Sequence, residues 1–212
     1  GDFALLFAFD FLSFWERKNP LAVIEAFKLA FASDEPVRLV LKSSNSKSPS
    51  VDPSGREKLE KSMQGMAVTW LDETLSRQEV RDLFRVCDCY VSLHRAEGFG
   101  LTIAEAMAMG KPVVATGYPG NVDFFNLNNG WPVQYDLVEI DENVGPYDAG
   151  TVWAEPDVAH AAQQMRSVYT DSAEREKRTR RARSDIQAQL SDTAVGEILG
   201  ARLKALARHR KA

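Results

Sequence analysis

The sequence predicts an α/β fold, a Rossmann-like parallel sheet with helices on both faces and a helical extension at the C-terminus. Short apolar segments recur along the first 135 residues, as buried parallel strands require. Amphipathic segments of helical period alternate with them, which is typical of βαβ units. From residue 156 onward the pattern is helical only. No linker divides the chain, so we expect one domain over residues 1–212, with residues 156–212 as the extension.

Six segments are expected to form the strands. Each is short, mostly apolar and bounded by turn-forming or polar residues. In chain order they cover residues 4–10, 37–41, 67–71, 89–93, 112–116 and 131–135. The segment that follows, residues 136–154, contains several acidic residues, two glycines and a proline. We expect a long exposed or functional loop there.

The expected helices lie between these strands and after the last one. Pro20 suits the first turn of a helix over residues 20–31, where apolar residues recur at helical spacing. Ser76 and Glu79 form a capping box at the start of a helix over residues 76–86. Further helices are expected over residues 54–63, from about residue 101, and over residues 157–169, 173–190 and 194–207.

Composition narrows the function classes. The formal net charge of −4 gives no basic field, so we expect no nucleic-acid partner. No apolar run approaches the roughly 20 residues that span a bilayer. The apolar residues 1–7 lack the basic start of a secretion signal and fit a buried strand better. The two cysteines, Cys87 and Cys89, are expected to be buried thiols in a reducing, cytoplasmic compartment.

The clearest candidate site is the turn that follows the fourth strand. Residues 92–102 leave this strand, pass Gly98 and Gly100, and enter a helix near Leu101. Ligands of open α/β sheets bind at the carboxyl ends of strands, and glycine lets a ligand approach the backbone closely. The free amides at the helix start form an anion site, which a phosphate would fit. Packing alone also produces such turns, so the glycines leave both interpretations open.

Two carboxylates sharpen this prediction. Glu97 lies in the loop, and Glu105 lies just over one turn inside the helix, between Ala104 and Ala106. A carboxylate in an apolar neighbourhood needs hydrogen-bond donors. Sugar hydroxyls are suitable donors, each contributing roughly 1.5–3 kcal/mol to a charged acceptor. The alternative is that Glu105 pairs locally and that Glu97 is a solvated loop residue.

The segment that contains both carboxylates also resembles a known protein family. The segment EGFGLTIAEAMAMGKPVVAT, residues 97–116, resembles the E-x7-E signature of glycosyltransferase family 4 and its relatives. The resemblance extends to residues 10–20, 118–124 and 153–157, and so covers nearly the whole chain. It implies the C-terminal, donor-binding half of a retaining GT-B enzyme. Such an enzyme transfers a sugar from a nucleotide-sugar donor to a hydroxyl acceptor without a metal ion or other cofactor.

The resemblance also implies roles for individual residues. Glu97 would contact hydroxyls of the donor sugar, and Lys18 would contact the diphosphate, so these two are the expected catalytic residues. Glu105 would hold the ribose hydroxyls of the nucleotide. Backbone amides of the same turn would contact the sugar and the diphosphate. The substrate-binding residues of this turn are Gly98, Phe99, Gly100, Leu101 and Thr102.

The chain departs from the family pattern after the first strand. Ser13 stands where the family usually has a phosphate-binding arginine, and Asn19 replaces a usual glycine. The second phosphate cation is therefore open, with Arg17 and Lys42 as candidates. A solvated loop position for Lys42 is an equal alternative. His94 flanks the site, and both a ligand contact and a structural role remain open for it.

The resemblance implies partners as well. The acceptor, a glycan or a lipid-linked molecule in polysaccharide or cell-envelope glycan synthesis, would bind an N-terminal domain that residues 1–212 do not include. We therefore expect this chain alone to bind nucleotide but to transfer sugar poorly. Six basic residues between Arg175 and Arg183 suggest peripheral contact with the inner face of a membrane. Interspersed acidic residues favour a solvated helix face instead.

Two other classes of function compete with the transferase. One is a nucleotide-sugar epimerase or phosphorylase of the same architecture, which the E-x7-E pattern does not favour. The other is a non-catalytic α/β module that binds a sugar or a partner protein. Nucleotide binding that depends on Glu105 separates the transferase from the module.

Overall fold

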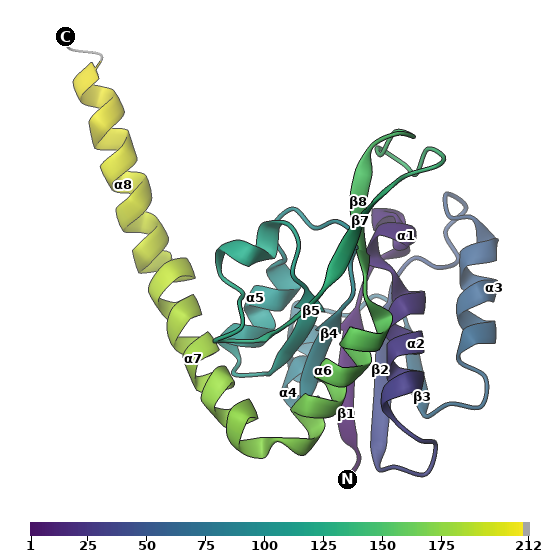
Figure 1. Ribbon diagram of the computed structural model, residues 1–212. Helices are drawn as coiled ribbons and strands as arrows, with labels where there is room; N and C mark the ends of the chain where they lie inside the picture. The colour runs from purple at the N-terminus through teal and green to yellow at the C-terminus, as the bar shows by residue number, and fades with distance from the viewer. Residues whose placement is uncertain (210–212) are drawn as a thin grey trace.

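The computed structural model describes residues 1–209, and its centre is a six-stranded sheet in which every strand is parallel to its neighbours (Figure 1). The strands are β1 (Phe3–Ala8), β2 (Val37–Ser43), β3 (Val68–Asp72), β4 (Cys89–Ser92), β5 (Val113–Thr116) and β6 (Trp131–Val133). Their spatial order is β3-β2-β1-β4-β5-β6. This is the order of a doubly wound Rossmann-like sheet, so the predicted fold class is confirmed.

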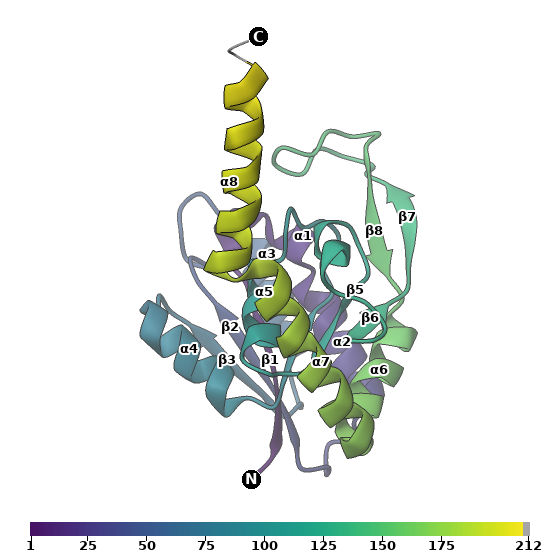
Figure 2. The same cartoon turned by 90° about the vertical axis from the view of Figure 1, so that its left-hand side faces the viewer.

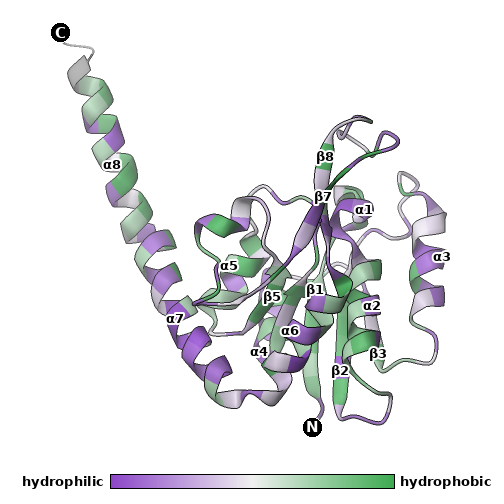
Figure 3. Cartoon of the chain, viewed as in Figure 1, coloured by the Kyte–Doolittle hydropathy of each residue, from purple (hydrophilic) through white to green (hydrophobic). Residues whose placement is uncertain are grey.

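Helices cover both faces of the sheet, as Figures 1 and 2 show. One face carries α2 (Pro20–Ala30), α3 (Pro53–Ser62) and α6 (Val158–Thr170); the other carries α4 (Arg77–Val86), α5 (Leu101–Ala108) and α7 (Ser172–Leu190). Successive strand residues point to opposite faces. Leu5 therefore joins the core under α2 and α6, whereas Leu6 joins the core under α4, α5 and α7. Figure 3 shows the apolar strands enclosed by these helices.

The connection after β1 contains two short helices that the sequence did not predict. They are η1 (Phe11–Ser13) and α1 (Trp15–Lys18), and they precede α2. Phe14 and Asn19, which flank α1, both adopt left-handed backbone conformations, with φ of 61° and 54°. Asparagine tolerates this region better than most residues, which explains how Asn19 replaces a glycine. These two bends turn α1 toward the loop after β4.

The segment after β6 corrects one prediction. Residues 135–156 form an antiparallel hairpin of β7 (Tyr135–Glu139) and β8 (Val152–Pro156), which projects beyond the carboxyl end of the sheet (Figure 1). The expectation of a loop over residues 136–154 was therefore wrong for both strands. The hairpin is paired only with itself, and Asp136 and Leu137 are exposed. Its strands consequently lack the apolar runs that identified the central strands.

The described residues that follow the hairpin are helical, as predicted. After α6 and α7, helix α8 (Asp192–His209) extends away from the body (Figures 1 and 2). The predicted extension also included residues 210–212, which lie outside the described residues. Within residues 1–209 no helix is both long enough and apolar enough to cross a membrane. Cys87 and Cys89 are buried free thiols, as expected.

Candidate functional site

The carboxyl ends of β1 and β4 meet where the strand order reverses, which is where open α/β sheets bind ligands. Lys18, at the end of α1, donates a short hydrogen bond to the carboxylate of Glu97 in the loop after β4. The Arg17 guanidinium lies 3.6 Å from the same carboxylate. It also donates to the backbone oxygens of Ala96 at 2.8 Å and Ser13 at 3.2 Å. The fold thus brings Ser13, Arg17, Lys18 and Glu97 together.

Glu97 is surrounded by positive charge. The side chains of Glu97, Lys18 and Arg17 are each less than a fifth exposed. Burial by itself raises the pKa of the Glu97 carboxyl. The charge and hydrogen bond of Lys18, followed by the charges of Arg17 and His94, hold that pKa below its ordinary value. Two cations therefore face one ionised carboxylate, which leaves positive charge for an anionic ligand.

The start of α5 provides a second anion-binding feature. Gly100, at its N-cap, has φ of 88°, and no side chain of residues 1–209 caps this helix. Helices α3, α4, α6 and α7, in contrast, each begin with a side-chain cap, from Asp52, Ser76, Asp157 and Asp171. The first backbone hydrogen bond of α5 runs from the Ala104 amide to the Gly100 oxygen. The amides before Ala104 form an open helix start, which favours a negatively charged group.

The loop after β5 supports this turn. It contains η2 (Gly120–Asp123), and the Gly120 amide donates to the Glu97 oxygen at 3.3 Å. A Cβ atom at Gly120 would lie only 2.1 Å from the backbone oxygen of Gly98. A glycine is therefore required at position 120 for the two loops to pack. We did not single out Gly120 from the sequence, although the Pro119-Gly120 pair was a signal for a tight turn.

His94 lies beneath the turn and has no exposed surface. Its Nε2 donates to the Tyr118 oxygen at 2.6 Å, and its Nδ1 accepts from the Ser92 hydroxyl at 3.0 Å. Burial lowers the pKa of the imidazole, although the Tyr118 hydrogen bond and Glu97 oppose this effect. Both ring nitrogens are thus engaged within the protein. The geometry favours the structural alternative for His94 over the predicted ligand contact.

Several of the predicted residues of α5 and its approach are exposed. Glu105 is exposed, and among the described residues none forms a hydrogen bond or ion pair with its side chain. The expectation that apolar neighbours would bury Glu105 was wrong, because α5 turns Ala104 and Ala106 inward and Glu105 toward solvent. Gly98 and Leu101 are also exposed. The Phe99 ring packs on the Phe124 ring, with 5.1 Å between their centroids. The Thr102 hydroxyl accepts a hydrogen bond from the Tyr90 hydroxyl at 2.9 Å.

Lys42 occupies a different place from the other candidates. It is 9 % exposed and belongs to β2, so a solvated loop position is ruled out. Burial lowers the pKa of its amine, and the nearby charges that oppose this are Asp10, Asp72 and Glu73. Asp72 is held by the Ser43 hydroxyl at 2.7 Å, among other groups. Lys42 therefore belongs to a polar cluster at the ends of β2 and β3, and Glu97 is not among its charged neighbours.

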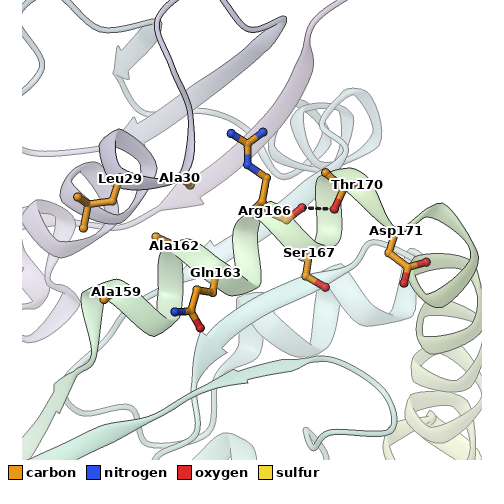
Figure 4. A pocket seen from close by; sticks show the side chains of 9 residues that line it. All are labelled: Leu29, Ala30, Ala159, Ala162, Gln163, Arg166, Ser167, Thr170 and Asp171. Atoms are coloured by element: carbon orange, nitrogen blue, oxygen red, sulfur yellow. Dashed lines mark hydrogen bonds between the residues drawn. The ribbon is translucent and has the colours of Figure 1, made fainter.

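A large hollow lies elsewhere on the surface. It has a volume of about 760 Å³ and runs between α2 and α6, along Leu29, Ala162, Gln163 and Thr170 (Figure 4). Figure 4 shows Arg166 rising from α6 beside it. The wall consists mainly of small side chains and the ends of two helices. The hollow contains none of the predicted site residues, so its size does not identify it as the functional site.

The basic stretch of α7 is largely paired. Arg178 and Lys177 contact Glu174, and Arg181 contacts Asp185 at 2.7 Å. The Arg178 guanidinium also lies 4.8 Å from the Trp131 ring. These contacts agree with a solvated helix face, and membrane contact stays a prediction. In the described part of the chain, no group of three or more His, Cys, Asp or Glu side chains is arranged to hold a metal ion.

Comparison with known proteins identifies a family that matches most of the chain. The family model described as "Glycosyl transferases group 1" matches residues 13–185. A search of curated proteins found no match. Among solved structures, the Anabaena protein HepE, crystallised with UDP and glucose, aligns with a TM-score of 0.71 at 17% identity, covering 96% of this chain and 48% of HepE.

Two further structures give the same fold. The C-terminal domain of LpcC from Francisella tularensis, a glycosyl transferase group 1 protein, has a TM-score of 0.64 at 16% identity, covering 89% of this chain and 86% of that domain. Sucrose-phosphate synthase from Thermosynechococcus elongatus has a TM-score of 0.71 at 18% identity, covering 98% of this chain and 46% of the synthase. The chain thus spans about half the length of HepE and of the synthase. At these identities the likeness shows the fold alone, and the roles of the site residues stay predictions.

Proposed function

The chain belongs to the glycosyl transferases group 1 family, and from that premise we propose that it is the donor-binding domain of a retaining transferase that moves a sugar from a nucleotide-sugar to a hydroxyl acceptor. One observation carries this proposal. At the reversal point of the sheet, the open start of α5 and the cations of α1 surround a single carboxylate, Glu97. Amides and cations suit a diphosphate, and a carboxylate suits sugar hydroxyls.

The positive groups would stabilise the leaving group. As the acceptor oxygen forms its bond to the anomeric carbon, the bond from that carbon to the diphosphate breaks. The nucleoside diphosphate leaves with the electron pair and takes up the proton of the acceptor hydroxyl. Groups already oriented toward this developing negative charge lower the barrier. We assign this work to Lys18 and to the amides of the turn from Gly98 to Thr102. Arg17 is our choice for the second cation, because it faces Glu97 while Lys42 faces other acids.

The two glutamates would bind hydroxyl groups. The lowered pKa of Glu97 keeps it ionised, so it accepts hydrogen bonds from the donor sugar and does not act as a glycosidase acid. Glu105 is exposed on the same helix whose start receives the diphosphate, and we assign it to the ribose hydroxyls. The short turn from Glu97 to Glu105 would thereby hold sugar, diphosphate and ribose in sequence. We propose that this binding needs no metal ion.

The nucleotide can be sought among a few candidates. HepE was crystallised with UDP and glucose, and TarM of S. aureus with UDP, so UDP is the first nucleotide to test. We propose thermal unfolding of this chain with UDP, GDP, ADP, CMP and their sugar conjugates. A ligand at about a hundred times its dissociation constant adds roughly 2.7 kcal/mol of stability. That corresponds to a rise of roughly 2–4 °C per kcal/mol for a chain of this size.

The controls identify the site. Glu105→Ala should abolish the rise for the nucleotide that binds, whereas Glu57→Ala, which alters another exposed glutamate on α3, should retain it. A rise that survives in the Glu105 variant would place the nucleotide elsewhere. No rise with any nucleotide would contradict donor binding by this domain and favour the non-catalytic module.

A further inference from the structure

Arg95 follows β4 directly and connects the candidate site to the projecting hairpin. Its guanidinium forms a two-point pair with Glu155 of β8, with Nε at 2.6 Å and Nη2 at 3.0 Å from the two carboxylate oxygens. The guanidinium also lies 4.9 Å from the centroid of the Trp153 ring. The backbone oxygen of Arg95 accepts from the Ala154 amide at 3.0 Å. Both the side chain and the backbone of Arg95 are therefore bound to β8.

The same residue also holds α1. The Nη1 atom of Arg95 donates to the Glu16 oxygen at 3.0 Å, and its amide donates to the Arg17 oxygen at 2.8 Å. Helix α1 has only four residues, too few for a stable helix on its own. Its position must therefore come from tertiary contacts of this kind. Lys18, the next residue of α1, is the one that pairs with Glu97.

The hairpin contacts α1 at both of its ends. Beyond the last residue of α1, the Asn19 amide group lies 3.5 Å from Glu155, the partner of Arg95. Before its first residue, the Phe14 ring packs on Gly145 at the tip of the hairpin, where a Cβ atom would lie 2.0 Å from the ring. Arg95 and Glu155 thus form the centre of a brace that joins the hairpin, α1 and the loop after β4.

We propose that Arg95 and Glu155 are positioning residues, which fix α1 so that Lys18 and Arg17 face Glu97, and that the β7–β8 hairpin thereby sets the geometry of the site. The consequence for donor binding rests on the proposed function. The brace itself is a property of the chain without ligand, so it can be tested independently. Arg95 acts through α1 and is not assigned a contact with the substrate.

Two substitutions distinguish a role in positioning α1 from a purely electrostatic effect on the pKa of Glu97. Arg95→Lys keeps the charge, but a single ammonium cannot hold both Glu155 oxygens and the Glu16 backbone together. Glu155→Gln removes a negative charge, which by electrostatics alone would lower the pKa of Glu97. Loss of positioning predicts a higher Glu97 pKa in both variants, because Lys18 and Arg17 move away while His94 stays fixed by Ser92 and Tyr118.

The measurement is a ¹³C NMR titration of the Glu97 carboxyl in the ligand-free chain, with circular dichroism to confirm folding of each variant. We expect the Glu97 pKa to rise by about half a unit or more in both variants, a part of the 1–3 units that a nearby cation contributes. Arg166→Lys is the matched control, since Arg166 also forms a two-point pair, with Glu35, and should leave the Glu97 pKa unchanged. An unchanged pKa in Arg95→Lys, or a lowered pKa in Glu155→Gln, would overturn the proposal.

A second measurement uses UDP as the probe and tests the link to function. Weaker UDP binding in Arg95→Lys and Glu155→Gln than in Arg166→Lys supports the consequence for the donor site. Equal UDP affinity in all three variants would overturn that consequence. If the Glu97 pKa rises but no nucleotide binds even the unaltered chain, the brace stands and the proposed function fails.

Discussion

The carboxyl and amino edges of the sheet each carry an arginine clamped to a carboxylate over an aromatic ring. Arg95 pairs with Glu155 and stacks on Trp153 at the carboxyl edge. Arg166 pairs with Glu35 and stacks on Phe31 near the amino edge, where a hollow of about 760 Å³ lies beside it. Considered singly, the two pairs are chemically alike, and the hollow lies beside the second pair.

The surroundings of the two pairs differ. Beside Arg95 lie the open start of α5 and the group of Lys18, Arg17 and Glu97, in which positive charge exceeds negative. Arg166 and Glu35 neutralise each other in a two-point pair, and the hollow beside Arg166 is lined mainly by small side chains. Neither an ion pair nor a hollow therefore identifies a functional site by itself. The carboxyl edge is distinguished by charge left unmatched at the point where the strand order reverses.

The largest expected effect tests this unmatched charge. Lys18→Gln removes the charge-assisted hydrogen bond that we propose Lys18 donates to the donor diphosphate, and such a bond is worth roughly 1.5–3 kcal/mol. We expect the nucleotide-sugar to bind about 10- to 100-fold more weakly in a calorimetric titration. Lys28→Gln, on the exposed surface of α2, is the control from the amino edge and should retain full affinity. Equal losses in the two variants would mean that overall charge, and not the carboxyl edge, controls binding.

The next effect concerns the packing of the turn. Gly120→Ala would place a Cβ atom 2.1 Å from the Gly98 oxygen, so the backbone of one loop must move. We expect a loss of about 1–3 kcal/mol in the free energy of unfolding, together with weaker nucleotide binding. Gly196→Ala in α8, where a Cβ atom meets no atom of the described residues within 4 Å, should instead stabilise the chain slightly. A stable Gly120→Ala variant with normal affinity would remove this loop from the site.

The smallest expected effect is the pH dependence of stability, which differs between the two edges of the sheet. The folded-state pKa of His94 is lowered. The neutral imidazole therefore contributes its full stabilisation above about pH 6.5, and this contribution is lost as the pH falls below that value. The loss is at most about 1.4 kcal/mol per pH unit. The pKa of Glu35 is lowered from 4.5 to about 2, chiefly by its hydrogen bond from Arg166, so the amino-edge pair weakens only between these values. Chemical denaturation between pH 7.5 and 5.5 should show a slope that His94→Asn reduces, and an unchanged slope would contradict this assignment.

Much of the fold was predictable because its signals are local. Five of the six central strands are largely buried, whereas the edge strand β3 is half-buried, and all six lie within a few residues of their predicted bounds. The capping box of Ser76 and Glu79 is present as predicted. The turn from Glu97 to Leu101 was recognisable because strand, glycines and helix follow one another directly. Such features depend on neighbours within a few positions, which the sequence records in order.

The hairpin, by contrast, has no local signal that predicts its two strands. Its strands expose much of their surface and are held by pairing with each other, so they carry no continuous apolar run. Glu105 was expected to be partly buried because its sequence neighbours are apolar, but the rotation of α5 exposes it. Lys42 lies just beyond the predicted strand 37–41, which allows a solvated loop, but β2 extends to Ser43 and includes it. In each case the outcome depended on strand pairing or on packing against another element of the fold.

The sequence by itself determined the fold class, the order of the elements and the turn where an anion can bind, since each of these is encoded in hydrophobic period and turn chemistry. Only the tertiary structure decided which side chains meet there. Lys18 and Glu97 are 79 positions apart, and Arg95 and Glu155 are 60 apart. The parallel sheet places the ends of β1 and β4 side by side, and Glu155 of the hairpin contacts Asn19 and Arg95 in the segments that follow these strands. Contacts at such separations depend on how the elements pack, and no local pattern in the chain specifies them.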